Sequence, residues 1–187
     1  MWIMAKLFSF IRLVYKKLVS KVSYIKCKYF MNSVSIGNNV TFGSKCYISC
    51  TDGGSLTIDD NVSICDNVKI VVQGGHVIIG SDVHIGDGCI ITSKEGICIG
   101  AESLIAEYVV IRDQDHSLDC RPIRKSGFKT GMIVIGKDVW IGAKSSILRN
   151  CNIGNAAVVG AHSLIRSDIP EYTLAVGVPA KVIKHIK

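Results

Sequence analysis

Large aliphatic residues recur at every sixth position along most of the chain. Eighteen sites follow this period: Ile36, Phe42, Ile48, Ile58, Ile64, Ile70, Ile79, Ile85, Ile91, Ile99, Ile105, Ile111, Ile135, Ile141, Ile147, Ile153, Val159 and Ile165. The residue two positions earlier is aliphatic or small, as at Val34, Cys46 and Ser145, and residues i and i−2 of a strand point to the same face. A period of six fits neither an amphipathic helix nor simple strand alternation. It is typical of a parallel β-helix, so the pattern predicts an all-β rod whose triangular coils use 18 residues each.

Interruptions of this period predict where the chain leaves the rod. The first four coils are spaced by 22, 21 and 20 residues, so small loops are expected at residues 52–55, 73–76 and 93–96. Ile135 follows Ile111 by 24 positions, where six would continue the coil. Residues 112–132 are therefore expected to form one long excursion loop. Long loops on a rigid scaffold are the usual place for binding and catalysis.

The N-terminal segment has a different pattern. Residues 1–28 contain neither Gly nor Pro, and apolar residues recur at spacings of three and four: Ile3, Leu7, Ile11, Val14, Leu18, Val22 and Ile25. Basic residues fall on the opposite half: Lys6, Arg12, Lys16, Lys17 and Lys21. We expect residues 1–30 to form a basic amphipathic helix, residues 31–170 the rod, and residues 171–187 a tail that packs on it. The helix suits either an anionic membrane surface or packing on the rod or on copies of itself.

Charge and cysteine usage narrow the class of protein. The net charge is +7, but residues 1–51 hold eight Lys and Arg and no acid, whereas the rest carries 14 basic and 15 acidic residues. A nearly neutral rod argues against nucleic-acid binding. The eight cysteines form no CxxC pair, which indicates reduced structural thiols in a cytoplasmic protein and no metal site.

The long loop opens with a histidine flanked by carboxylates. His116 follows Asp113 and Asp115 at the base of the excursion. Imidazole titrates near neutral pH and can take a proton from an alcohol, and a neighbouring carboxylate can orient it and stabilise the imidazolium. His116, Asp113 and Asp115 are therefore the candidate catalytic residues.

Several motifs carry a family resemblance over residues 33–187. They are Ile135-Gly-Lys-Asp-Val-Trp-Ile-Gly-Ala143, Val159-Gly-Ala-His-Ser163, Ser167-Asp-Ile-Pro170 and Gly177-Val-Pro-Ala-Lys-Val-Ile183. With them the chain resembles the hexapeptide-repeat acyltransferases. The resemblance implies a left-handed parallel β-helix, acetyl-CoA as co-substrate, and a homotrimer with active sites between neighbouring rods.

The resemblance also implies roles for single residues. His116 takes the place of the family's catalytic base, and the backbone N–H of Ala143 takes that of the oxyanion donor. Trp140 corresponds to an aromatic residue that flanks the acceptor cleft. The positions that correspond to coenzyme A contacts are Ala143, Ala161, Arg166, Ser167, Lys181 and Lys184.

Departures from the simple sugar acetyltransferases bear on the acceptor. Those enzymes carry an Asn in the coil before the one that leads to the catalytic histidine, where this chain has Asp87. They carry Gly directly before that histidine, where this chain has Asp115. The stretch around Asp115 is more similar to acetyltransferases of surface-polysaccharide biosynthesis, such as those of colanic acid, O-antigen or capsule. Arg124 and Lys125 in the loop are either a solvated tip or the receptor of an anionic acceptor.

We therefore predict an acetyl-CoA-dependent O-acetyltransferase acting on a sugar hydroxyl of a surface polysaccharide or its precursor. It is expected in the cytoplasm, with contact to the inner face of the membrane through residues 1–28. A serine or amino-sugar acetyltransferase and a non-catalytic β-helix scaffold are the alternatives. The zinc-dependent carbonic anhydrases of this fold need a histidine five residues beyond the second ligand, and five beyond His116 stands Arg121, which argues against that class.

Overall fold

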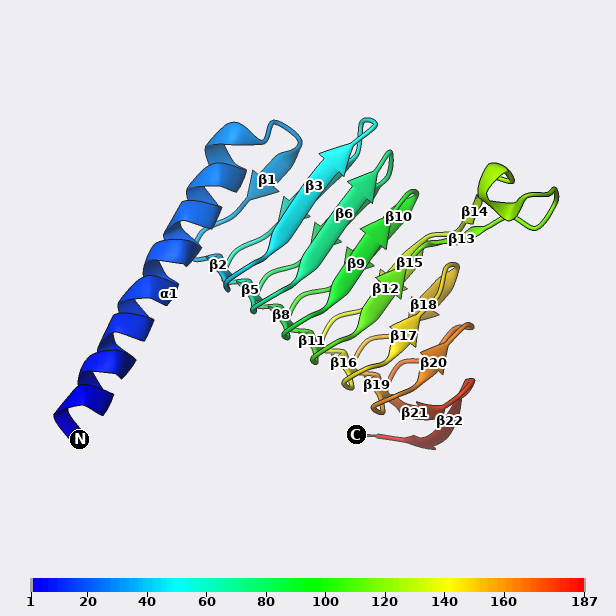
Figure 1. Ribbon diagram of the computed structural model, residues 1–187. Helices are drawn as coiled ribbons and strands as arrows, with labels where there is room; N and C mark the ends of the chain where they lie inside the picture. Colours follow the sequence, from blue (N-terminus) through cyan, green and yellow to red (C-terminus); the bar gives the residue numbers. More distant parts are fainter. Residues whose placement is uncertain (1, 187) are drawn as a thin grey trace.

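A computed structural model describes residues 2–186, in which one long helix is followed by a rod of stacked strands (Figure 1). The helix α1 spans Trp2–Phe30. Of its side chains, those of residues 2–5, 7–9, 13, 16 and 28–30 lie outside the described part. The predictions for the Ile3, Leu7 and Lys16 side chains therefore lie outside it too.

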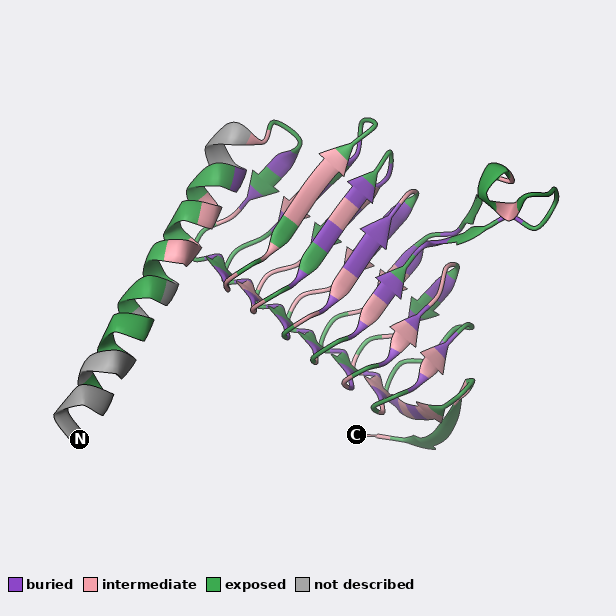
Figure 2. Ribbon diagram, viewed as in Figure 1, coloured by how far each residue is buried: buried purple, intermediate pink, exposed green. Residues whose placement is uncertain are grey.

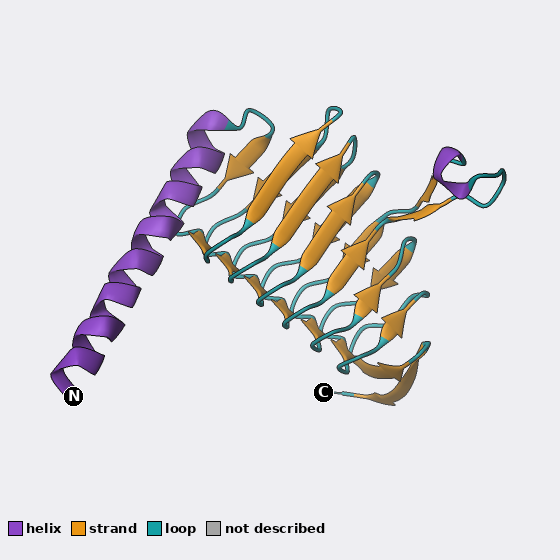
Figure 3. Cartoon of the chain, in the orientation of Figure 1, coloured by secondary structure: helices purple, strands orange, loops and turns teal. Residues whose placement is uncertain are grey.

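Three sheets of mainly parallel strands form the faces of the rod, and up to β12 each is built from every third strand of the chain (Figure 3). Sheet A holds β1 (Val34–Ile36), β4 (Ser55–Ile58), β7 (His76–Ile79), β10 (Gly96–Ile99), β15 (Ile133–Ile135) and β18 (Cys151–Ile153). Sheet B holds β2 (Thr41–Phe42), β5 (Ser63–Ile64), β8 (His84–Ile85), β11 (Leu104–Ile105), β16 (Trp140–Ile141), β19 (Val158–Val159), β21 (Thr173–Gly177) and β22 (Ala180–His185). Sheet C holds β3 (Tyr47–Thr51), β6 (Lys69–Gln73), β9 (Ile90–Ser93), β12 (Val110–Arg112), β17 (Ser146–Ile147) and β20 (Leu164–Ile165).

The six-residue sites face the inside of the coils, and buried positions recur along the strands of the rod in Figure 2. Seventeen of the eighteen are buried, and Ile48 is half-buried. Equivalent sites stack in register, so that Ile85 lies between Ile64 and Ile105 of the neighbouring coils. Each buried Ile contributes roughly 1.5–3 kcal/mol, and stacking like on like keeps the core continuous. The predicted left-handed parallel β-helix with an N-terminal helix is confirmed.

The corners of the rod are named by the sheets that they join. At the A–B corner, Asn39, Asn61 and Asp82 adopt positive φ values of 55°, 61° and 59°, which Asn and Asp tolerate better than most residues. Coils also approach closely here: a Cβ on Gly100 would lie 2.5 Å from the backbone of Gly136 in the next coil. The predicted small loops are found at the C–A corner, where β3 turns into β4, β6 into β7 and β9 into β10.

The long excursion also leaves the rod at the C–A corner (Figure 3). It contains β13 (Gln114–His116), a 3-10 helix η1 (Ile123–Lys125) and β14 (Phe128–Thr130), and β13 pairs with β14 in antiparallel fashion. We call residues 113–132 the arm. The coils on either side of it stack directly, since β10 pairs with β15 and β12 with β17, so the rod is not broken.

The helix α1 lies across the first coil with its less apolar side toward the rod. The Ser20 hydroxyl accepts a hydrogen bond from the N–H of Phe42 at 2.9 Å, and the Tyr24 hydroxyl donates to the carbonyl of Gly37 at 3.1 Å. Cys27 is 3% exposed. These three contacts fix the orientation of the helix on the first coil.

The predicted apolar stripe points away from the rod in the described part of the helix. Ile11, Val14, Leu18, Val22 and Ile25 are between 38% and 60% exposed. The alternative prediction that the stripe packs on the rod of its own chain is therefore wrong for these five residues. Among residues 2–186, no helix has the length and apolar character needed to cross a membrane.

The C-terminal residues extend the rod. β21 pairs in parallel with β19, and β22 folds back on β21 in antiparallel fashion. The tail thus continues sheet B over the last coil.

Candidate active site

His116 lies at the base of the arm, where its ring stacks on an aromatic neighbour. It is paired with Phe128 across the β13–β14 ladder, and the two ring centroids are 4.6 Å apart at 32°. The ammonium of Lys94 lies 4.4 Å from the centroid of the same Phe128 ring. Neither ring nitrogen of His116 has a hydrogen-bond partner among the described residues. The imidazole is therefore supported on one side, exposed, and available to a substrate.

Asp113 occupies a different environment from the one expected. Its side chain is fully buried and accepts four hydrogen bonds from the turn at 93–96. The donors are the Ser93 hydroxyl at 2.7 Å and the backbone N–H groups of Lys94, Glu95 and Gly96 at 2.8, 2.9 and 2.8 Å. In place of the expected contact with His116, this carboxylate ties the root of the arm to the preceding coil.

Asp115 also has a partner other than His116. Its carboxylate accepts a hydrogen bond from Nε of Arg149 at 2.9 Å. Asp115 and His116 are adjacent in a strand, and adjacent side chains point to opposite faces. Within the described chain, no carboxylate is hydrogen-bonded to His116. Asp115 instead links the arm to the coil that follows it.

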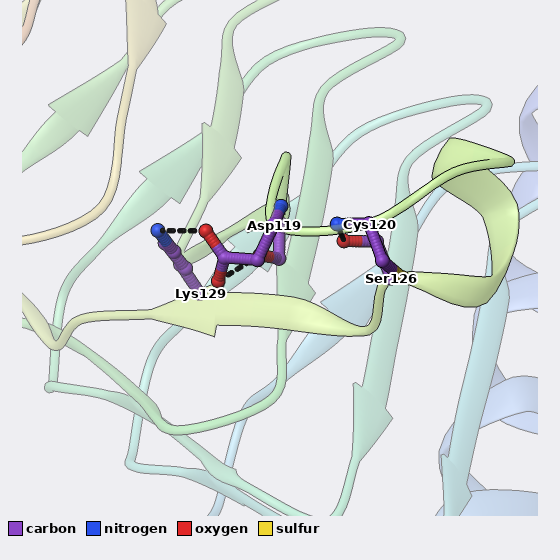
Figure 4. A network of polar contacts seen from close by, with 5 residues as sticks. Asp119, Cys120, Ser126 and Lys129 are labelled. Carbon is purple, nitrogen blue, oxygen red and sulfur yellow. Dashed lines mark hydrogen bonds and ion pairs between the residues drawn. The ribbon is translucent and has the colours of Figure 1, made fainter.

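A polar network orders the outer part of the arm (Figure 4). Asp119 accepts hydrogen bonds from the Ser117 hydroxyl at 2.6 Å and from Nζ of Lys129 at 3.1 Å. The Ser117 hydrogen bond, followed by the Lys129 cation, lowers the pKa of the Asp119 carboxyl. The N–H of Cys120 donates to the Ser126 hydroxyl at 3.3 Å. Beyond this network, Arg124 and Lys125 lie exposed in η1.

Ala143 lies at the B–C corner, where its backbone N–H donates to none of the described residues. Earlier coils show why. At the same corner the N–H of Ser44 donates to Oδ1 of Asp66 in the next coil at 2.8 Å, and that of Asp66 donates to Oδ1 of Asp87 at 2.8 Å. The residue below Ala143 is Ala161, which has no side-chain acceptor. The N–H of Ala143 is thereby left for an external oxygen.

The two predicted acceptor contacts on the rod lie near Ala143. Trp140 is 52% exposed on the outer face of sheet B, between Leu104 and Val158 of the neighbouring coils. Asp87 is exposed at the B–C corner, two coils before Ala143. One of its oxygens is used by the Asp66 N–H described above.

The expected coenzyme A residues gather at the C-terminal end of the rod but at different corners. Ala161 is exposed at the B–C corner. His162, which follows Ala161, donates its N–H to the carbonyl of Ala143 at 2.9 Å. Arg166 and Ser167 are exposed at the C–A corner after β20. The two lysines, Lys181 and Lys184, are exposed on β22.

Within one chain, the predicted catalytic and acceptor residues therefore lie in two separate groups. The arm with His116 leaves from the C–A corner, whereas Ala143, Trp140 and Asp87 lie at or beside the B–C corner. Among the residues that the structure describes, no three His, Cys, Asp or Glu side chains are placed to hold a metal ion.

Known proteins share both the sequence pattern and the fold. The family description "Bacterial transferase hexapeptide (six repeats)" matches residues 132–167. WbbJ of Escherichia coli, named for O-acetyl transfer in lipopolysaccharide biosynthesis, is 35% identical over 185 residues, which cover 94% of this chain and 87% of WbbJ. The chain belongs to the hexapeptide-repeat transferases.

Two further known proteins are similar to the chain. Rv3034c of Mycobacterium tuberculosis, named for acetyl transfer, is 39% identical over 132 residues, and the chain spans 44% of its length. A mutant of AntD, an N-acyltransferase from Bacillus cereus crystallised with dTDP and coenzyme A, superposes with a TM-score of 0.75 at 28% identity and covers 90% of both chains. The prediction of a hexapeptide-repeat acyltransferase is confirmed.

Some contacts around this hexapeptide-repeat site were not predicted from the sequence. Phe128 under the His116 ring and Arg149 beside Asp115 are far from those residues along the chain. The β13–β14 pairing that brings Phe128 into place is too short to give a periodic signal, since each strand has three residues.

Proposed function

We propose that the protein is an acetyl-CoA-dependent O-acetyltransferase that acts on a sugar hydroxyl of a surface polysaccharide or its precursor. The observation that carries this proposal is the exposed imidazole of His116, supported on Phe128 with both ring nitrogens open. The similarity to WbbJ supports O-acetyl transfer to a surface glycan. Coenzyme A bound to AntD supports the co-substrate.

In the proposed reaction His116 takes the proton from the acceptor hydroxyl as the oxygen attacks the thioester carbonyl of acetyl-CoA. The carbonyl oxygen becomes negatively charged, and the N–H of Ala143 donates to it. Collapse of the tetrahedral intermediate breaks the carbon–sulfur bond, and the imidazolium returns its proton to the leaving thiolate. The products are the acetyl ester and coenzyme A. Asp113 has no part in these steps, and Asp115 acts on His116 only through the position of the arm.

The active site is completed by a second copy of the chain. His116 and Ala143 lie at different corners of one rod, so one chain does not bring the base and the oxyanion donor together. Side-by-side packing of rods in a homotrimer places the arm of one protomer against the B–C corner of the next. This is tested by mixing His116→Ala protein with Ala161→Asn protein, in which the N–H of Ala143 is blocked. Each variant is inactive alone, but a mixed trimer contains sites that combine the intact His116 of one chain with the open Ala143 N–H of the other.

The Ala143 role is tested by capping its N–H. At the neighbouring A–B corner, Oδ1 of Asn155 accepts from the N–H of Lys137 in the previous coil at 2.8 Å. Ala161→Asn places an amide oxygen at the same position below Ala143. We expect kcat to fall by about 10²–10³-fold, the usual contribution of an oxyanion donor, with no loss of thermal stability. An unchanged kcat would remove Ala143 from the mechanism.

The base is tested by His116→Ala, with Asp59→Ala at the A–B corner as a control at another exposed position. We expect kcat to fall by about 10²–10⁴-fold in the first variant and to stay at the wild-type value in the second. Melting temperatures should be equal, since neither side chain is buried. A fully active His116→Ala protein contradicts the proposed function.

Transfer to an amine is the second candidate, since AntD is an N-acyltransferase. The two products differ chemically. An acetyl ester is removed by mild alkali and an acetamide is not, so treatment of the labelled product with dilute hydroxide decides between them.

We also propose that α1 lays its outward stripe on the inner membrane surface. Residues 1–51 carry only basic charge, which favours anionic lipids. Leu18→Ser with Val22→Ser leaves the Ser20 and Tyr24 contacts intact. Loss of co-sedimentation with anionic vesicles in this variant supports the contact, and unchanged sedimentation contradicts it.

A further inference from the structure

A groove of about 720 Å³ lies between α1 and the first three coils, beside β2. One wall is the inner side of α1, where Lys17 and Lys21 flank the groove. The floor is the outer face of sheet B, where Thr41 and Ser63 point outward and their neighbours Phe42 and Ile64 point into the rod. The volume falls in the range of about 300–1,000 Å³ that small-ligand sites occupy, and the catalytic steps proposed above do not use it.

The helix wall of the groove carries positive charge without a partner. Neither Lys17 nor Lys21 forms an ion pair with any residue in the described part of the chain. Two cations along a concavity attract anions, and ammonium groups bind phosphate as point charges.

The opposite wall carries carboxylates at the B–C corner. Asp66 and Asp87 line the groove, and each uses Oδ1 to accept a backbone N–H from the previous coil. Carboxylates are hydrogen-bond acceptors only, so this wall suits hydroxyl donors and repels phosphate. The groove thus has an anion-binding wall, a floor that carries the Thr41 and Ser63 hydroxyls, and a hydroxyl-binding wall.

Only some ligands fit both walls. A neutral glycan leaves the lysines unused, and a free phosphate leaves the carboxylates unused. A sugar joined to a phosphate or diphosphate uses both, with its hydroxyls toward the carboxylates and its phosphate toward the lysines. We propose that this groove binds the phosphate-linked end of the acceptor, so that the acceptor is a glycosyl phosphate or diphosphate precursor, not a finished polysaccharide.

The position of Asp87 joins this groove to the proposed reaction centre. Asp87 lies two coils from Ala143 along one corner, about 10 Å at the spacing of neighbouring strands. A glycan whose end lies in the groove therefore reaches the acetyl group beside Ala143 within one or two sugar units. This inference rests on the proposed function for the identity of the acceptor, but the binding site can be tested without catalysis.

The first test uses Cys65, which lines the groove, in the full-length assembled protein. Its alkylation rate is measured by peptide mass spectrometry, with the exposed Cys120 of the arm as internal control. UDP-glucose and a short polyprenyl-diphosphate glucose should protect Cys65 and not Cys120, whereas methyl glucoside should not protect. The better of the two diphosphates assigns the source as nucleotide or lipid.

Charge dependence is tested with Lys17→Met combined with Lys21→Met, which keeps the aliphatic stems and the helix propensity. The concentration for half-protection should rise about tenfold or more, and Lys26→Met on the same helix should leave it unchanged. Protection should also weaken as ionic strength rises. Equal protection by methyl glucoside, or an unchanged concentration in the double variant, overturns the proposal. So does a Cys65 that reacts only after unfolding, because a second copy then fills the groove.

The second test is kinetic. The double variant should raise KM for a phosphate-linked acceptor about tenfold and leave kcat and the KM for acetyl-CoA unchanged. If no sugar is acetylated but the diphosphates still protect Cys65, the proposed function fails and the groove assignment stands. If acetyl transfer proceeds and no diphosphate protects Cys65, the groove assignment fails and the proposed function stands.

Discussion

Replacing Asp113 separates a structural role from a catalytic one. Its buried carboxylate accepts four hydrogen bonds from the Ser93 hydroxyl and from the backbone between Lys94 and Gly96. A hydrogen bond to a charged group contributes about 1.5–3 kcal/mol, and bonds that share one acceptor are not additive. We therefore expect Asp113→Ala to lower the free energy of unfolding by about 3–6 kcal/mol. Asp113→Asn, which turns an NH₂ group toward donors, should lower it by about 2–3 kcal/mol.

Urea unfolding followed by circular dichroism measures this loss. Hydrogen exchange at Lys94, Glu95 and Gly96 locates it, since their N–H groups lose their acceptor. Asp115→Asn is the matched control: its pair with Arg149 is partly exposed, so the change should stay within about 1 kcal/mol. The reasoning is refuted if Asp113→Asn keeps wild-type stability and loses kcat by about 10²-fold or more, because Asp113 would then act in the chemistry.

Three further predictions follow from the packing. Burial raises the pKa of the Cys89 thiol from 9.0 to about 11, because the folded protein disfavours the thiolate. This difference contributes about 2–3 kcal/mol to the free energy of unfolding, which is fully present below pH 9 and is lost as pH rises toward 11. Melting temperatures measured from pH 8 to 11 should fall accordingly. Gly100→Ala should lower the melting temperature, because its Cβ would lie 2.5 Å from the backbone of Gly136; a wild-type temperature would show that the coils can move apart. Ser20→Ala removes the acceptor of the Phe42 N–H and should cost about 1 kcal/mol, with faster hydrogen exchange confined to α1 and the first coil.

The six-residue period predicted the rod because it depends on local geometry. A strand alternates its side chains, and each coil repeats the same inward positions. A residue such as Ile85 is therefore buried whatever its neighbours on the outer face. Residues 112–132 were predicted to leave the rod because the run of aliphatic sites lapses there, with Ser117 and Lys129 at two of the three six-residue positions.

The period does not specify which groups meet across coils. Asp113 was expected beside His116 because the two are close in sequence, but the C–A corner turns its carboxylate into the preceding coil. The apolar stripe of α1 was equally consistent with packing on the rod. Ser20, Tyr24 and Cys27 decide that orientation through their contacts with the first coil.

The sequence by itself thus determined the β-helix, its core positions, the excursion and the candidate base His116, since all of these depend on spacing along the chain. The tertiary structure alone decided that the N–H of Ala143 is left open above Ala161, that His116 and Ala143 lie at different corners, and that Lys17 and Lys21 face Asp87 across a groove. These facts depend on register between coils and on how the helix lies on the rod. Contacts between residues far apart in sequence set both.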